Sequence, residues 1–213
     1  IVEQIEVKQK AIEGAKQVIE SLERERRYFG QSLRKLENVE MVELGQIAHV
    51  EAGQSPEGRF YNENKEGTPF YQGKTGFGDI FISEPKVWTT KVTKIAEPGD
   101  ILMSVRAPVG PVNITKERVC IGRGLASIRA KSVEQMYIFN YLRSIQHEII
   151  GNGGAVFDSI NKTQIEKIII PIASIEKQKE IVQKIENEER IIESNKKLID
   201  IMEKKIKEVL ETI

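Results

Sequence analysis

The stretch IVEQIEVKQKAIEGAKQVIESLERERR at positions 1–27 returns in altered form as IVQKIENEERIIESNKKLIDIMEKKIK at positions 181–207. Setting each residue beside the one 180 positions further on gives nine identities, and four of these are pairs of isoleucines. Two similar segments therefore flank a middle segment whose composition is different.

Isoleucine recurs every seven residues in both versions, which is the pattern of helices that pack side by side along an apolar seam. Charged residues fill the other faces, and no proline interrupts either segment. We therefore predict a long amphipathic helix in each of the flanking segments, residues 1–40 and 174–213. The residues expected at the seam are Ile5, Ile12, Ile19, Leu22, Ile185, Ile192, Ile199, Met202 and Ile206.

Neither helix can bury its isoleucine stripe alone, and two arrangements would solve this. Each helix could lie separately on a shared globular core, or the two could pack on each other as an antiparallel coiled coil that projects from the middle domain. We expect the second arrangement. Asn195 falls at a seam position, where a buried amide can fix the register of two helices.

The middle segment, residues 41–173, has the short apolar runs and the Pro and Gly punctuation of a β-rich domain. MVELGQIAHVEAG (41–53) suggests a strand, one helical turn and a second strand. Helical spacing is seen from Val133 to Ile150, a loop follows at 151–159, and residues 160–171 suggest a short helix and a strand. The other β-like runs are PFYQG, DIFIS, KVTKIA, DILMSV, VNIT, VCI and LASIRA. The predicted fold class is α/β (α+β), a β-rich domain flanked by two long helices.

Composition excludes several kinds of protein. Basic and acidic residues balance in each segment, with 8 against 8 in residues 1–40, 15 against 14 in 41–175 and 9 against 10 in 176–213. Such balance argues against sequence-blind binding of polyanions, although a few well-placed arginines suffice for reading bases. One cysteine and two histidines cannot build a Cys/His zinc site, and no apolar run is long enough for a membrane span. We expect a cytoplasmic protein without a metal.

Motifs of catalysis are missing. QGKTG (72–76) lacks the spacing of a phosphate-binding loop, and the glycines of GRG (122–124) and GNGG (151–154) are too few for a dinucleotide site. The Asn-Pro-Pro-Tyr motif of a methyltransferase is also missing. We therefore expect no catalytic residue, although the many carboxylates leave an unrecognised hydrolase as an alternative.

Polar loops between the short strands carry side chains of the types that can contact DNA. Arg and Gln make paired hydrogen bonds with guanine and adenine edges, while Lys and Ser commonly hold phosphates. The candidates for DNA contact are Gln54, Ser55, Arg59, Tyr71, Gln72, Lys74, Thr75, Arg106 and Arg123.

With these features in view, the chain resembles one half of the specificity subunit of type I restriction–modification systems. The residues that carry the resemblance are VELGQIAHVEAGQSP (42–56), EPGDILMSVRAPVGPVNI (97–114), GRGLASIRA (122–130) and GGAVFDSINKTQIEKIIIPIASIEKQKEIVQKIE (153–186). In the last stretch Gln178 and Ile181 match the family phrase, whereas Ala173 replaces its second proline.

The resemblance implies a target recognition domain at 41–173, held between two conserved helices that act as a spacer and as a dock for a methyltransferase. It implies double-stranded DNA as ligand, no chemistry in this chain, and S-adenosylmethionine in the methyltransferase partner or in a fused domain. A restriction subunit is a further candidate partner. A short subunit that forms a homodimer, a fragment, and the tail of a fused enzyme all fit the sequence, and the alternative to DNA binding is a coiled-coil adaptor whose head binds protein.

Overall fold

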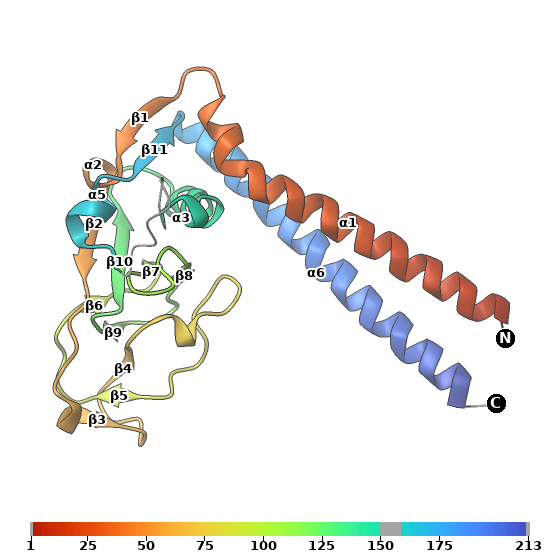
Figure 1. The fold of residues 1–213 in the computed structure, drawn as a ribbon, viewed down its shortest axis with the longest axis horizontal. Coiled ribbons are helices and arrows are strands. Elements are labelled where there is room, and N and C mark those ends of the chain that lie inside the picture. Colours follow the sequence, from red (N-terminus) through yellow and green to blue (C-terminus); the bar gives the residue numbers. More distant parts are fainter. Residues whose placement is uncertain (1, 150–158, 212–213) are drawn as a thin grey trace.

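The computed structural model describes residues 2–149 and 159–211 and has two parts, a two-helix rod and a β-rich head (Figure 1). The rod consists of α1 (Val2–Arg34) and α6 (Ile175–Glu211), which run antiparallel. At about 1.5 Å per residue these helices are ~50 and ~55 Å long. The start of α1 and the end of α6 lie at the free end of the rod, away from the head (Figure 1).

The isoleucine stripe lies at the contact between the two helices. Ile185 and Ile192 are only 7% and 6% exposed, and Ala15 of α1 is 4% exposed. The other expected seam positions are all partly buried: Ile5, Ile12, Ile19, Leu22, Ile199, Met202 and Ile206. Since α1 packs along α6 and only its last turns reach the head, the expected antiparallel pair is confirmed.

The amide of Asn195 does not cross this seam. Its Nδ2 donates to the carbonyl of Ile191, 2.8 Å away in the same helix. A register role for Asn195 therefore finds no support in its hydrogen bond, and the apolar side chains set the alignment of the two helices.

The head end of the rod joins the core of the head. Leu33 of α1 is 3% exposed and belongs to the main core together with side chains of α3 (Gln135–Ser144). Beside it, Arg26 of α1 and Arg143 of α3 approach one carboxylate oxygen of Glu189 in α6, at 3.5 and 3.1 Å. Burial lowers the pKa of the Arg26 guanidinium, and the charge of Glu189 opposes that effect. Rod and head thus meet through both apolar and ionic contacts.

Gln178 ties the start of α6 to the head. Its side chain is 2% exposed, its Nε2 donates to the carbonyl of Ala173 at 2.8 Å, and its Oε1 accepts the backbone N–H of Glu134 at 2.9 Å. Ser174 caps the helix, because its Oγ accepts the backbone N–H of Lys177 at 3.3 Å. The position of α6 relative to the head is therefore fixed by buried hydrogen bonds.

The chain enters and leaves the head side by side. β1 (Glu40–Glu43) pairs antiparallel with β11 (Ile169–Ile172), and Val42 lies opposite Ile170. The predicted strand, helical turn and strand at the entrance are found as β1, α2 (Leu44–Ile47) and β2 (Ala48–Ala52). This pairing holds the two ends of the head beside the two helices.

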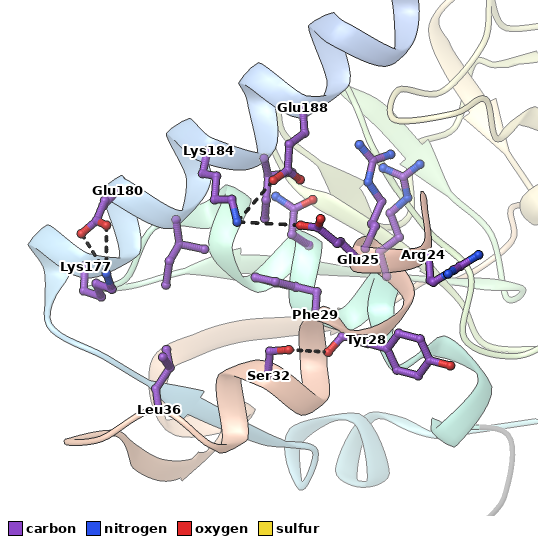
Figure 2. A pocket seen from close by; sticks show the side chains of 15 residues that line it. Arg24, Glu25, Tyr28, Phe29, Ser32, Leu36, Lys177, Glu180, Lys184 and Glu188 are labelled. Atoms are coloured by element: carbon purple, nitrogen blue, oxygen red, sulfur yellow. Dashed lines mark hydrogen bonds and ion pairs between the residues drawn. The ribbon is translucent and has the colours of Figure 1, made fainter. Parts of the chain in front are cut away.

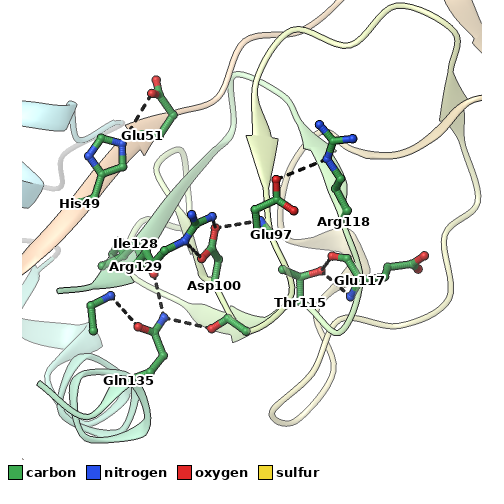
Figure 3. Close-up of polar contacts among 12 residues, drawn as sticks. His49, Glu51, Glu97, Asp100, Thr115, Glu117, Arg118, Ile128, Arg129 and Gln135 are labelled. Atoms are coloured by element: carbon green, nitrogen blue, oxygen red, sulfur yellow. Dashed lines mark hydrogen bonds and ion pairs between the residues drawn. The ribbon is translucent and has the colours of Figure 1, made fainter. Parts of the chain in front are cut away.

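A central antiparallel sheet forms the framework of the head. Its strand order is β2–β10–β7–β8, with the last three at Leu125–Ala130, Ile101–Ser104 and Val112–Ile114. Helix α3 packs Tyr137, Phe139 and Tyr141 into the core, where each is 0% exposed. Asp100, which precedes β7, receives two hydrogen bonds from Arg129 of β10 at 2.6 and 2.8 Å (Figure 3). This ionic pair joins two neighbouring strands at the edge of the core.

A second sheet of short strands lies at the side of the head away from the rod (Figure 1). Its order is β3–β5–β4–β9–β6, formed by Tyr61–Asn62, Trp88–Thr89, Thr68–Tyr71, Val119–Ile121 and Ile95–Ala96. A smaller core beneath it contains Tyr71, Leu102, Ile121 and Leu125. Long loops connect these strands, and they carry most of the candidate DNA contacts.

Several elements differ from the sequence-based expectation. DIFIS (79–83) forms isolated bridges rather than a strand, and within KVTKIA only Ile95–Ala96 pairs. The predicted helix from Val133 divides into α3 and α4 (Gln146–Ile149), because the backbone at Ile145 leaves the helical conformation. The predicted short helix near the exit is α5 (Lys162–Glu166). Most of the predicted loop at 151–159 lies outside the described residues.

Candidate nucleic-acid interface

Three loops that are far apart in the sequence meet where β2, β4 and β9 end. The backbone N–H of Gly124 donates to the carbonyl of Gln72 at 3.1 Å, and that of Gly122 donates to Tyr71 at 2.8 Å. The loop after β2 joins them, because the N–H of Gln54 donates to the carbonyl of Ile121 at 2.9 Å. The candidates on these loops are thereby brought together by backbone hydrogen bonds.

Glycine is required at this meeting point because backbone approaches backbone. A Cβ on Gly124 would lie 2.4 Å from the carbonyl oxygen of Gln72, and one on Gly53 would lie 2.2 Å from that of Gly122. Neither distance is compatible with a side chain. The glycines of the GRG turn, which do not form a dinucleotide site, therefore serve close packing of the three loops.

The hydroxyl of Ser55 lies between two other candidate residues. Its Oγ donates to Oε1 of Gln72 at 2.8 Å and accepts the backbone N–H of Arg123 at 3.1 Å. These residues are 17 and 68 positions from Ser55 in the sequence. The fold thus assembles one hydrogen-bonded group from residues that the sequence only placed on separate loops.

A cavity of about 750 Å³ opens beside this group. Five of the predicted DNA contacts line it, namely Ser55, Tyr71, Gln72, Thr75 and Arg123. One wall is aromatic, since the rings of Tyr61 and Phe70 stack at a centroid distance of 4.8 Å and an angle of 20°. The cavity therefore combines apolar walls with polar groups at its rim, as binding sites for planar ligands do.

Tyr71 supports the cavity more than it faces it. Its side chain is 6% exposed, and its hydroxyl donates to the carbonyl of Ser83 at 2.7 Å. Burial raises the pKa of this hydroxyl from 10.0 to about 12, and the nearby charges of Glu117 and Glu84 add to the effect. The hydroxyl proton is engaged in the protein, so the ring acts as part of the floor.

The remaining candidates lie around the cavity rather than in its lining. Arg59 pairs with Glu57 at 3.0 Å and lies over the ring of Phe60, 4.9 Å from its centroid. Gln54 and Lys74 are exposed on the loops themselves. Arg106 is exposed on the loop after β7, which reaches the GRG turn because the N–H of Val105 donates to Gly124 at 3.0 Å. Apart from Tyr71, which ends strand β4, the candidates thus lie on the loops and short turns around this cavity.

Sequence reasoning missed Lys86, which also lines the cavity. The stretch SEPKVW around it has neither a motif nor a periodic pattern that would have drawn attention to it. Its place in the cavity depends on the loop between η2 (Lys74–Gly76) and β5, whose course is set by contacts with distant strands. The side chains of Lys74, Lys86, Arg106 and Arg123 make no ion pair within residues 2–149 and 159–211.

The described residues contain no group of His, Cys, Asp and Glu side chains that could hold a metal ion. None of the helices in this part of the chain is long and apolar enough to cross a membrane.

Comparison with known proteins identifies the family of this chain. The model of the type I restriction modification DNA specificity domain matches residues 36–208. The chain therefore belongs to this family, whose specificity subunits are non-catalytic components that recognise DNA.

Two curated relatives come from Methanocaldococcus jannaschii. The putative type I restriction enzyme MjaX specificity subunit is 42% identical over 180 residues, which cover 82% of this chain and 42% of that protein. The type I restriction enzyme MjaIX specificity subunit is 30% identical over 121 residues, which cover 52% of this chain and 27% of that protein. The chain thus spans less than half the length of these relatives.

Solved structures agree with the fold. The HsdS subunit from Thermoanaerobacter tengcongensis matches with a TM-score of 0.77 and 28% identity, over 98% of this chain and 54% of that one. A chain from a structure on complex assembly and conformational transition of the type I R-M system gives 0.75 and 28%, over 98% and 55%. The S subunit from M. genitalium, at a TM-score of 0.57 and 14% identity over 96% and 59%, shares the fold alone.

Proposed function

We propose that this chain reads one half of a two-part DNA site through its head and uses the rod as spacer and as dock for a methyltransferase. The observation that carries the proposal is the convergence of the candidate contact residues on linked loops at the side of the head away from the rod (Figure 1). A loop surface in that place is free to approach DNA while the rod holds other partners.

The side chains of this surface divide by chemistry. Arg106, Arg123 and Gln72 carry the donor groups that contact base edges in the major groove. Lys74 and Lys86 supply point charges that suit phosphate oxygens. Since the chain has no net charge, sequence-independent binding contributes little, and base contacts must provide most of the discrimination.

The rod suits the role of spacer because it is stiff and carries the head at one end. Two heads at a fixed distance read half-sites at a fixed separation, and the symmetry of the protein is then mirrored in the DNA. In the proposed arrangement a second recognition domain stands at the other end of the rod, either in the same polypeptide or in a second copy of this chain.

One side of the rod suits a helical partner. Glu25 and Lys184 approach to 4.0 Å across the two helices. Seven residues further from the head, the corresponding positions in the two helices are apolar: Val18 and Ile191, which are 41% and 45% exposed. A pocket of about 570 Å³ opens at the head end of the same line, with Phe29 pointing into it (Figure 2). An exposed apolar line on a two-helix rod is suited to further helices packing on it.

We assign this surface to a methyltransferase subunit or domain, which would bind S-adenosylmethionine and carry out the transfer in the cytoplasm. A restriction subunit would join the same assembly. This chain's own residues serve recognition and assembly in that complex.

The proposal is tested by DNA binding of the protein together with its methyltransferase partner. We expect Arg106→Ala and Arg123→Ala each to weaken binding of the selected duplex by roughly 10-fold, while binding of random duplex changes little, because a lost base contact costs about 1–3 kcal/mol. The control is Lys167→Ala, at an exposed position at the end of α5 and outside the lining of the cavity. Unchanged affinity of both arginine variants for the selected duplex at ~150 mM salt would contradict the assignment.

A further inference from the structure

The direction of one hydrogen bond decides what Gln72 presents to a ligand. The Ser55 hydroxyl accepts the backbone N–H of Arg123, and it donates its single proton to Oε1 of Gln72 at 2.8 Å. The amide oxygen is turned toward the GRG turn, since a Cβ on Gly122 would lie 2.5 Å from it. The amide nitrogen is therefore at the outward end of the side chain, and it donates to no group among residues 2–149 and 159–211.

Arg123 adds donors of the same kind. Its backbone is held by Ser55, while its guanidinium is exposed at the rim of the cavity and has no ion pair or hydrogen bond in the described part of the chain. An arginine has only donors, whatever the pH. The cavity thus presents donors from Gln72 and Arg123, and both residues are anchored on one hydroxyl.

The anchor itself is rigid. The residue before Ser55 is bound to β9, through the N–H of Gln54 and the carbonyl of Ile121 at 2.9 Å. The residue after it, Pro56, is buried, and its carbonyl accepts the hydroxyl of Tyr61 at 2.8 Å. Ser55 is therefore held from both sides, so that its hydroxyl has a defined place before any ligand binds.

A pair of donors selects a base edge that offers acceptors. In the major groove guanine presents N7 and O6, both acceptors, whereas cytosine presents an amino donor and adenine one acceptor beside one donor. An amino group placed against Gln72 Nε2 and Arg123 would leave donors unpaired on both sides, which binding sites reject strongly.

We infer that Ser55 is a positioning residue that holds Gln72 and Arg123 as joint hydrogen-bond donors, and that this group reads a guanine at one position of the half-site. This inference rests on the proposed DNA recognition. It adds the identity of one base and assigns the orientation of Gln72 to a residue that itself makes no base contact.

The experiment is selection of duplexes from a randomised pool by the protein with its methyltransferase partner, followed by sequencing. The parent is expected to enrich a site containing a guanine. Gln72→Glu keeps the inward oxygen for Ser55 but turns an acceptor outward, so the preference at that one position should change from guanine to cytosine. Gln46→Glu, at an exposed position in α2, introduces the same charge elsewhere and should select the parental site.

Two substitutions of Ser55 test its role as a positioning residue. Ser55→Ala frees the Gln72 amide to turn over, and the preference for guanine over the other bases should fall roughly 10-fold at this position alone. Ser55→Thr keeps the hydroxyl and should retain the parental preference. Position-specific loss with rescue by threonine distinguishes orientation of Gln72 from a general structural effect, and thermal melting of each variant verifies that the head is folded.

The outcomes of the selection distinguish failure of this inference from failure of the proposed function. If the parent enriches a sequence but Gln72→Glu and Ser55→Ala enrich that same sequence, the inference is overturned while DNA recognition stands. An equal loss at every position in Gln72→Glu also overturns it, because the residue would then serve overall affinity. If the parent enriches no sequence, both the inference and the proposed function are wrong.

Discussion

Replacing Ile192 by alanine tests the seam that the whole arrangement depends on. Ile192 is 6% exposed between the two helices, while its neighbour Ile191 is 45% exposed on the same helix. Both changes remove the same three carbon atoms and gain the same helix propensity. The two variants, Ile192→Ala and Ile191→Ala, therefore differ in burial alone.

The expected magnitude follows from that difference. At about 0.8 kcal/mol for each buried carbon, Ile192→Ala loses ~2.3 kcal/mol of transfer free energy, and an unfilled cavity at the seam increases the loss. Ile191→Ala loses ~1.3 kcal/mol on the same scale. The higher helix propensity of alanine offsets about 0.4 kcal/mol of this loss in each variant. We expect a net loss of about 2–3 kcal/mol for Ile192→Ala and about 1 kcal/mol for Ile191→Ala.

Urea unfolding followed by circular dichroism at 222 nm measures both values, because the two long helices dominate that signal. The denaturant slope should be unchanged, so that the shift in midpoint reports stability. Ile192→Val, which removes one carbon, should fall between the parent and the alanine variant at about 1 kcal/mol. Equal destabilisation by Ile191→Ala and Ile192→Ala would refute the assigned seam.

Two other predictions concern the head. Gln178→Ala leaves the buried carbonyl of Ala173 and the partly buried N–H of Glu134 without their partner, so we expect a loss of about 2–4 kcal/mol in urea unfolding, whereas Gln183→Ala, at an exposed position in the same helix, should change stability by less than about 0.5 kcal/mol. Equal effects would show that the buried hydrogen bonds of Gln178 contribute nothing. Burial raises the pKa of the Tyr71 and Tyr137 hydroxyls to about 12, above the unfolded value near 10, so the folded state keeps protons that the unfolded state releases. The contribution of these hydroxyls should be constant up to about pH 10 and fall as the pH rises toward 12, and Tyr137→Phe should reduce the total fall in stability over this range by about 2–3 kcal/mol. An unchanged slope in that variant would contradict the attribution to Tyr137.

The strands of the head were only partly predictable. The runs that form β2, β7 and β10 are long enough to show an apolar pattern, and they were expected at the observed places. β3 and β5 contain two residues each, too few for any alternation to be visible, and they depend on partners elsewhere in the chain. The helix divides at Ile145 without a proline or glycine there, so the sequence does not indicate this break.

The candidate site was predicted as residue types on loops, without their mutual arrangement. Tyr71 illustrates the difference, since a tyrosine on a polar loop suggests a contact with DNA, whereas in the structure it is buried in the smaller core. Lys86 illustrates the reverse, because nothing around it in the sequence separates it from other surface lysines. Burial of a loop side chain depends on what packs above it, and that is decided elsewhere in the chain.

The sequence by itself determined the two helices of the rod. A repeat of seven residues places isoleucine on one face of a helix whatever the rest of the chain does, and such a face must be covered either by the other helix or by the globular core. The tertiary structure decided that the two helices cover each other. Only the tertiary structure decided that Ser55, Gln72 and Arg123 share one hydroxyl, since these residues are brought together by strand pairing between distant segments. A helical periodicity can be recognised from neighbouring residues, whereas a binding group formed by three loops exists only after the sheets have formed.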